Sequence, residues 1–291
     1  MDPSISCIFA PSGRGKTVDA LYTAPTGWFL TPAPGGLVAA RSMMGLEVRE
    51  VRCNSIEHAC TVLKKAGKVD AVILDDFSIL AERSHLALDS SGQKGWAVWK
   101  KLSQSVLRLR EIAMDSGTTL IITAHESQPS TYEGQFTPGG PKMPSKSLTN
   151  TLPHVASLVL RGVQDTFRQA PLWVGAYNCD PTDTRWITKD RFCVLGKQGP
   201  MNLREILVRA REVGHKVDIP RRAPGLEWLD EGAEAVAGFL AQGGSPSDAA
   251  RQLTANAKGA DPRHLRWAWR DGVARKELRN SGHSELFNLF T

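Results

Sequence analysis

Long apolar runs are missing from this 291-residue sequence. No stretch reaches the ~18 consecutive apolar residues that a membrane-spanning helix needs. The sequence begins Met1-Asp2-Pro3, and its first apolar stretch runs directly into a glycine loop, which is unlike a secretory signal. These absences predict a protein that has no membrane segment and is located in the cytoplasm.

Cysteine is also scarce. The five cysteines are Cys7, Cys53, Cys60, Cys179 and Cys193. Their number is odd and none of them forms a C-x-x-C pair, so the sequence indicates neither a disulfide framework nor a zinc site. We expect reduced thiols that are mostly packed in the interior.

What is present is an ordinary globular composition with a mild excess of positive charge. Hydrophobic residues make up 41% and charged residues 23%, which excludes a disordered chain. The formal net charge of +6 is compatible with a polyanionic partner but does not establish one.

Strand-like and helix-like segments alternate over the first two-thirds of the chain. Strands are expected at residues 4–9, 27–31, 47–53, 69–74, 118–123 and 186–195, and helices from about residue 16, at 55–66 and at 94–116. Strands separated by helices predict a mostly parallel sheet that is flanked by helices on both faces. The fold class expected is therefore α/β.

A change of pattern follows residues 220–225, which are rich in proline and arginine. From there the pattern is purely helical, with helices expected at about 226–241, 247–256 and 262–279. We predict a core at residues 1–219 and a small helical domain at residues 220–291, in which residues 244–253 resemble the first helix of a helix-turn-helix.

A phosphate-binding loop carries the strongest signal in the sequence. It reads Ala10-Pro11-Ser12-Gly13-Arg14-Gly15-Lys16-Thr17 and matches G-x-x-x-x-G-K-[ST] except at Ala10. The two glycines let the backbone N–H groups face phosphates, and Lys16, expected to face solvent, places a positive charge on them. The Thr17 hydroxyl is a ligand for Mg²⁺. The loop therefore predicts ATP and magnesium as cofactors.

Polar residues follow two of the expected strands at the edge where such sheets bind ligands. Asp75 and Asp76 end the strand at 69–74, and Asp75 suits the second magnesium ligand. Asp76 is the first candidate for the base that activates water. Glu126, which follows His125 in the sequence, is the reserve candidate. His125 is a candidate contact for the γ-phosphate.

The order of these parts resembles the RecA-like P-loop ATPases, and most closely the phage-type members linked to single-strand annealing and recombination. Four motifs carry the resemblance: Gly13-Arg14-Gly15-Lys16-Thr17, Val72-Ile73-Leu74-Asp75-Asp76, Ile121-Ile122-Thr123-Ala124-His125 and Thr188-Lys189-Asp190-Arg191. The resemblance implies that Lys189 and Arg191 act on ATP bound to a neighbouring subunit, and hence a homo-oligomer, either filament or ring. The glutamate that this family carries after its second strand is missing here.

A glycine-, proline- and lysine-rich segment at 133–150 stands where RecA-like proteins carry a mobile DNA-binding loop. Tyr132 and Phe136 are suited to stacking on bases, and Lys142 and Lys146 to contacting phosphates. The resemblance therefore implies a DNA-stimulated ATPase that binds single-stranded DNA. Alternatives are a ring-forming helicase or packaging motor, a P-loop kinase, or a nucleotide-switched structural protein.

The last eight residues, 284–291, contain four large apolar side chains at a chain end, where polar residues are the rule. We expect these side chains to pack either on the helical domain or on an adjacent subunit.

Overall fold

The computed structural model describes residues 4–33, 35, 37–45, 48–92, 95–163 and 175–281. The apolar tail at 284–291 lies outside these residues, so its packing stays a prediction. None of the described helices combines the length and apolarity needed to cross a bilayer. The expected cytoplasmic location is not tested by this finding.

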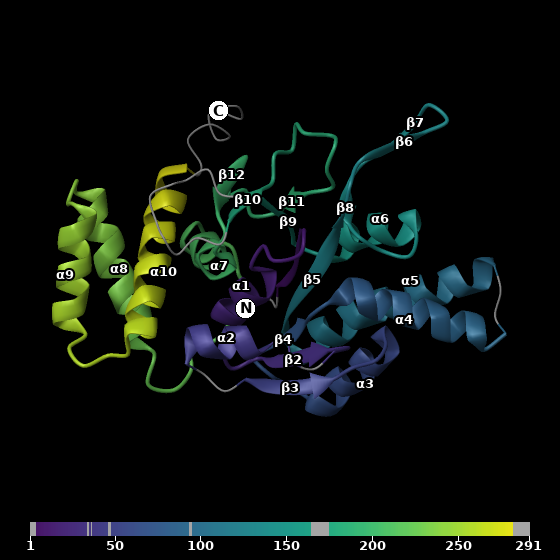
Figure 1. Ribbon diagram of the computed structural model, residues 1–291, viewed down its shortest axis with the longest axis horizontal. Helices are drawn as coiled ribbons and strands as arrows, with labels where there is room; N and C mark the ends of the chain where they lie inside the picture. Colours follow the sequence, from purple (N-terminus) through teal and green to yellow (C-terminus); the bar gives the residue numbers. More distant parts are fainter. Residues whose placement is uncertain are drawn as a thin grey trace.

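One large sheet forms the centre of the molecule (Figure 1). Its parallel part has the order β9 (Leu158–Val163), β1 (Ile5–Ala10), β5 (Thr119–Ser127), β4 (Ala71–Leu74), β2 (Trp28–Thr31) and β3 (Arg49–Arg52). Antiparallel additions are β10 (Ala176–Asn178), β12 (Gln198–Pro200), β11 (Lys189–Asp190) and β8 (Gly140–Pro141). The strand that precedes the phosphate-binding loop, β1, thus lies between β5 and β9, in the middle of the sheet.

Helices cover both faces of this sheet. Successive side chains of a strand point to opposite faces, and here both sets are buried in hydrophobic clusters. Cys7 and Phe9 of β1 join the hydrophobic cluster beneath α3 (Ile56–Ala66), α4 (Phe77–Ser90), α5 (Trp96–Ser116) and α6 (Lys146–Val155). Ile8 joins the cluster on the other face, with α1 (Lys16–Thr23), α2 (Leu37–Met44) and α7 (Leu203–Glu212). The predicted α/β P-loop fold, a mostly parallel sheet flanked by helices, is confirmed.

Three helices lie in the C-terminal part of the described residues: α8 (Trp228–Ala241), α9 (Pro246–Asn256) and α10 (Pro262–Ser281). They lie together at one end of the molecule in Figure 1, as the helical pattern predicted. Trp267 of α10 is buried, and its ring lies 4.9 Å from that of Tyr22 of α1. Residues on both sides of position 219 share one hydrophobic cluster. The division into two domains stays a prediction.

Several elements differ from the sequence-based expectation. Helices α2 and α4 were not predicted, and the segment at 133–150, expected to lack regular structure, contains β7 (Gln135–Thr137), β8 and α6. The serine N-cap at Ser145, whose side chain accepts from the Leu148 N–H, explains where α6 starts. The strand expected at 186–195 is reduced to β11 because Asp190 turns the chain: its carboxylate accepts the N–H groups of residues 192–195.

Candidate functional site

The phosphate-binding loop connects the end of β1 to the start of α1, as predicted. Gly13 and Gly15 adopt φ angles of 74° and 79°, in the left-handed region that glycine enters at no steric cost. Gly15 is the N-cap residue of α1, and no side chain caps this helix end. The unpaired N–H groups at the helix start therefore face the loop, where they suit an anion.

Lys16 lies inside the loop and does not face solvent, so that expectation was wrong. Its side chain is buried, and its Nζ donates to the carbonyl oxygens of Ala10 and Pro11, each at 3.0 Å. Burial lowers the pKa of Lys16, while Asp76, Asp75 and Glu126 act in the opposite direction. The ammonium is therefore held at the loop by its own backbone, close to three carboxylates.

Thr17 and Asp75 meet beside the loop, as the magnesium prediction requires. The Thr17 hydroxyl donates to Asp75 at 3.0 Å, and Thr123 of β5 donates to the same carboxylate. Burial raises the pKa of Asp75, and the two hydroxyl groups oppose this shift. A hydroxyl and a carboxylate are hard oxygen ligands of the kind that Mg²⁺ takes when it also binds substrate phosphates and water.

Asp76, the residue after Asp75, contacts the neighbouring strand β5. It is the N-cap of α4 and accepts from the Ser78 N–H at 2.7 Å, and its second oxygen lies 2.8 Å from Nε2 of His125. Ser78 in turn accepts the His125 N–H. The structure therefore brings Asp76 and His125 together as a carboxylate–imidazole pair at the carboxyl edge of the sheet.

Glu126, the reserve candidate for the base, is held by partners that the sequence did not suggest. Arg161 of β9 donates to it at 2.8 Å, and Gln128 donates to its other oxygen. The guanidinium of Arg161 also lies 3.3 Å from the centre of the Trp186 ring. The strand β5 extends through residues 125 and 126, beyond the end expected at 123. A basic residue near the end of a parallel strand is the signal that could have pointed to Arg161.

With the loop at the end of β1, these contacts bring the predicted phosphate and magnesium residues to one edge of the sheet. The fold is that of an α/β P-loop NTPase. The sequence matches neither a known protein family nor a curated protein. Among solved structures it is similar to a KaiC-like protein from the hyperthermophilic archaeon Pyrococcus horikoshii OT3, with 13% identity and a TM-score of 0.35, covering 57% of this chain and 76% of that one. A likeness this weak adds nothing on function.

Among the residues that the structure describes, no group of three or more His, Cys, Asp or Glu side chains is arranged to hold a metal ion. The four described buried cysteines and the exposed Cys193 are all free thiols. The oxygen pair of Thr17 and Asp75 is thus the arrangement that suits a metal, together with phosphate oxygens.

Lys189 and Arg191 lie far from the loop of their own chain. The Arg191 N–H bonds to Ser157, whose N–H bonds to Ile5 at the start of β1. Over the six residues of β1, a strand rise of roughly 3.3 Å per residue places Arg191 roughly 17 Å from the loop. Lys189 donates to the carbonyl oxygens of Pro153 and Ala156 at the end of α6. Both cations therefore lie away from the phosphate-binding loop of their own chain, and the predicted action on a neighbouring subunit stays a prediction.

The residues expected to bind nucleic acid lie on and beside a projecting hairpin. Its strands are β6 (Ser130–Tyr132) and β7, and they extend away from the body of the molecule (Figure 1). Tyr132 is 71% exposed and Phe136 is 51% exposed. Lys146 donates to Thr137 at 2.8 Å, while Lys142 is exposed on the adjacent segment. The hairpin replaces the unstructured loop that was expected.

Asp19 is a buried carboxylate that sequence reasoning missed. It lies in α1, and it accepts from the Tyr177 hydroxyl, from the Leu203 N–H at the start of α7, and from Arg270 of α10. The helix that begins at the phosphate-binding loop is thus joined to the C-terminal helices by an ion pair. No sequence periodicity indicates a contact between residues that are 251 positions apart.

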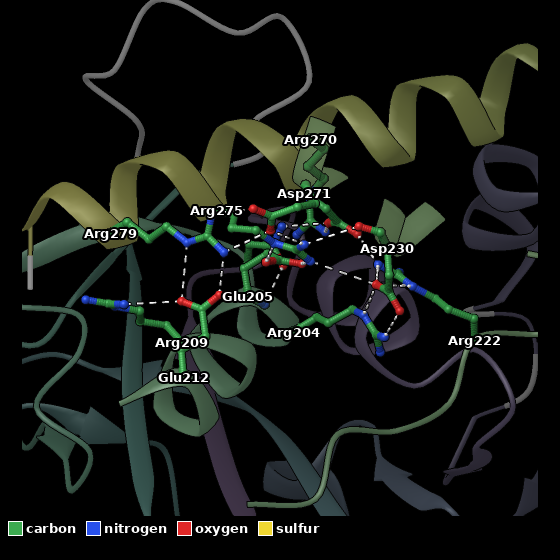
Figure 2. Close-up of polar contacts among 12 residues, drawn as sticks. Arg204, Glu205, Arg209, Glu212, Arg222, Asp230, Arg270, Asp271, Arg275 and Arg279 are labelled. Atoms are coloured by element: carbon green, nitrogen blue, oxygen red, sulfur yellow. Dashed lines mark hydrogen bonds and ion pairs between the residues drawn. The ribbon is translucent and has the colours of Figure 1, made fainter. Parts of the chain in front are cut away.

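A larger set of ion pairs surrounds this contact and joins α7 to α8 and α10 (Figure 2). Arg222 and Asp271 are almost completely buried, with 2.7 Å between Nη2 and Oδ2. Arg275 binds Glu205 through two hydrogen bonds of 2.7 and 3.0 Å. We expect these buried pairs to set the position of the C-terminal helices on the core.

Proposed function

We propose that this protein is a magnesium-dependent ATPase. The observation that carries the proposal is the contact of Thr17 with Asp75 directly beside Lys16, at the start of a helix whose N–H groups are open to an anion. The loop N–H groups and Lys16 would hold the β- and γ-phosphates, and Thr17 and Asp75 would hold the ion. Bound magnesium would neutralise charge that develops on the phosphate oxygens.

We further propose that Asp76, paired with His125, is the base that orients or deprotonates the attacking water. Glu126 is the weaker candidate, because Arg161 and Gln128 hold its two oxygens and its side chain is 2% exposed, against 13% for Asp76. His125 is partly exposed and lies where it would respond to the γ-phosphate. In this assignment Asp76 would take the role of the glutamate that RecA-like ATPases carry after their second strand and that is missing here.

Substitution of Asp76 by asparagine is expected to slow hydrolysis by about 10²–10⁴-fold, the usual contribution of general-base catalysis, with little change in ATP affinity. Single-turnover hydrolysis and equilibrium binding of an ATP analogue measure the two effects separately. Glu126→Gln is the matched comparison, since it also removes one carboxylate from the same sheet edge. A large loss in Glu126→Gln and a small one in Asp76→Asn would exchange the two roles.

The finer part of the proposal is that the ATPase forms oligomers and is stimulated by single-stranded DNA, as in phage-type recombination or annealing. The projecting hairpin supports binding of single-stranded DNA. Its exposed aromatic side chains add little to the hydrophobic core, and they are suited to stacking on bases. The decisive measurement is the ATPase rate with and without single-stranded DNA. If single-stranded DNA does not change the ATPase rate, the proposed ATPase activity stands and the proposed stimulation by DNA is wrong.

Alanine in place of Tyr132 or Phe136 is expected to weaken binding of single-stranded DNA by about 1–3 kcal/mol each. Cross-strand register pairs Thr131 with Phe136 and Tyr132 with Gln135, so the two rings lie on opposite faces of the hairpin. They contact different bases, and their losses should add. Fluorescence anisotropy with a labelled oligonucleotide measures the affinities.

The matched control is Leu86→Ala, which removes another exposed apolar side chain, on α4. DNA affinity that falls equally in Leu86→Ala and in the hairpin variants would contradict a stacking role for the hairpin.

A further inference from the structure

A basic cavity of about 220 Å³ lies at the edge of the sheet opposite the phosphate-binding loop. Its lining includes Arg110, His154, Arg191, His215 and Lys216, together with Ser4 and Ile5 at the start of β1. In the part of the chain that the structure describes, no aspartate or glutamate lines it. Three cations, Arg110, Arg191 and Lys216, around one hollow without an acid create a positive potential that attracts anions.

These side chains come from distant parts of the sequence. Arg110 belongs to α5, Arg191 follows β11, and Lys216 follows α7. The Arg191 N–H donates to the Ser157 carbonyl at 3.1 Å, and Nε2 of His215 donates to the Phe192 carbonyl oxygen at 3.2 Å. The backbone around the cavity is therefore held in place, while the arginine and lysine side chains remain exposed.

The positive charge at this edge also acts on a neighbouring lysine. Burial lowers the pKa of Lys189, and the charges of Arg191 and Arg110 lower it further. Both guanidinium groups are thus close enough to repel a third cation. An anion in the cavity would relieve this repulsion.

The other large cavities differ in this respect. A cavity of about 810 Å³ is also lined by several arginines, but Glu212, Glu227 and Asp230 share its lining and Asp230 already binds Arg204 and Arg222. A third, of about 550 Å³ between α8 and α9, has a largely apolar and uncharged lining. Of these three cavities, the one around Arg191 is lined by cations without any acid.

We propose that this cavity is a second phosphate-binding site, separate from the phosphate-binding loop, in which Arg191, Arg110 and Lys216 bind one phosphate group. Its volume is below the about 300–1,000 Å³ of sites that enclose a drug-sized ligand, which favours a single phosphate group over a whole nucleotide. Arginine binds phosphate through two parallel N–H groups, and lysine adds a point charge. The phosphate belongs either to a nucleotide held by a second copy of this chain or to free inorganic phosphate.

The test uses the full chain with Lys16→Ala, so that the phosphate-binding loop contributes little to phosphate binding. This variant is titrated with inorganic phosphate at constant ionic strength, and binding is measured by calorimetry. Binding should persist in Lys16→Ala and weaken about tenfold or more when Arg191→Ala or Arg110→Ala is added, since a hydrogen bond to a charged group is lost. Arg108→Ala is the control, because it removes the same charge from an exposed position of α5 outside the lining.

Two outcomes of this titration would overturn the proposal. One is the disappearance of phosphate binding with Lys16→Ala alone, and the other is an equal effect of Arg108→Ala and Arg191→Ala. An Arg191-dependent affinity for a single-stranded oligonucleotide without affinity for inorganic phosphate would also overturn it, in favour of a nucleic-acid surface.

A mixture of Lys16→Ala and Arg191→Ala chains distinguishes the two sources of the phosphate. This second experiment rests on the proposed ATPase activity. Recovered hydrolysis in the mixture supports a nucleotide on the second copy, because one interface regains an intact loop and an intact cavity. Phosphate binding that depends on Arg191, without recovered hydrolysis, supports free phosphate as the ligand. The calorimetric result stands even if the chain hydrolyses no ATP.

Discussion

Lys16→Ala is expected to lower the rate of ATP hydrolysis by about 10²–10³-fold or more, the cost of removing one donor that stabilises charge in a transition state. The lysine Nζ already lies at the loop, held by the carbonyl oxygens of Ala10 and Pro11. Phosphate oxygens would replace these two acceptors when ATP binds, without a large movement of the side chain. A phosphate-release assay at saturating magnesium measures the rate.

The same substitution is expected to leave the fold intact, although Lys16 is buried. Pro11 lies in the exposed loop, where water can replace the ammonium, and the buried Ala10 is held in β1 by its pairing with β5. The melting temperature should therefore stay close to that of Lys100→Ala, a control that removes an exposed lysine from α5. Wild-type turnover in Lys16→Ala would refute the assignment of the phosphate site.

Substitution of Arg270 by methionine is expected to destabilise the protein by about 3–5 kcal/mol, the usual cost of leaving one partner of a buried ion pair alone. Arg270 and Asp19 are 6% and 3% exposed, and Arg270 also donates to the Met201 carbonyl at 2.7 Å. Its removal leaves the Asp19 charge in the interior with neutral partners. Urea denaturation followed by circular dichroism measures the change in unfolding free energy.

Arg251→Met supplies the matched control, because Arg251 pairs with Asp248 at the surface, with 79% and 45% exposure. Such a pair contributes about 0–1 kcal/mol. The double variant Asp19→Asn with Arg270→Met should lose less than the sum of the two single variants, since it removes both charges. Equal losses in Arg270→Met and Arg251→Met would show that the pair does not hold α10 on α1.

Much of the nucleotide site could be predicted from the sequence because its parts are local. Gly13, Gly15, Lys16 and Thr17 are consecutive or nearly so, and the backbone geometry of the loop follows from the glycines. Asp75 was predictable because carboxyl ends of parallel strands meet at one edge of a sheet. The structure places it 3.0 Å from Thr17.

The partners of the candidate bases were not predictable. Asp76 and His125 were each identified by position, but their pairing depends on β4 and β5 being neighbours in the sheet. Arg161 reaches Glu126 although the two strands that carry them are separated by β1. A sequence pattern specifies which residues end a strand, and only strand order specifies which ends meet.

The sequence by itself determined the α/β class, the phosphate-binding loop and the helical C-terminal segment, since each depends on local spacing and periodicity. The tertiary structure decided that Asp19 binds Arg270, that residues 130–137 form a projecting hairpin, and that Arg191 shares a basic cavity with Arg110. Apart from the hairpin, these contacts join residues far apart in the chain. Their energy comes from burial and charge neutralisation between elements, which no local pattern records.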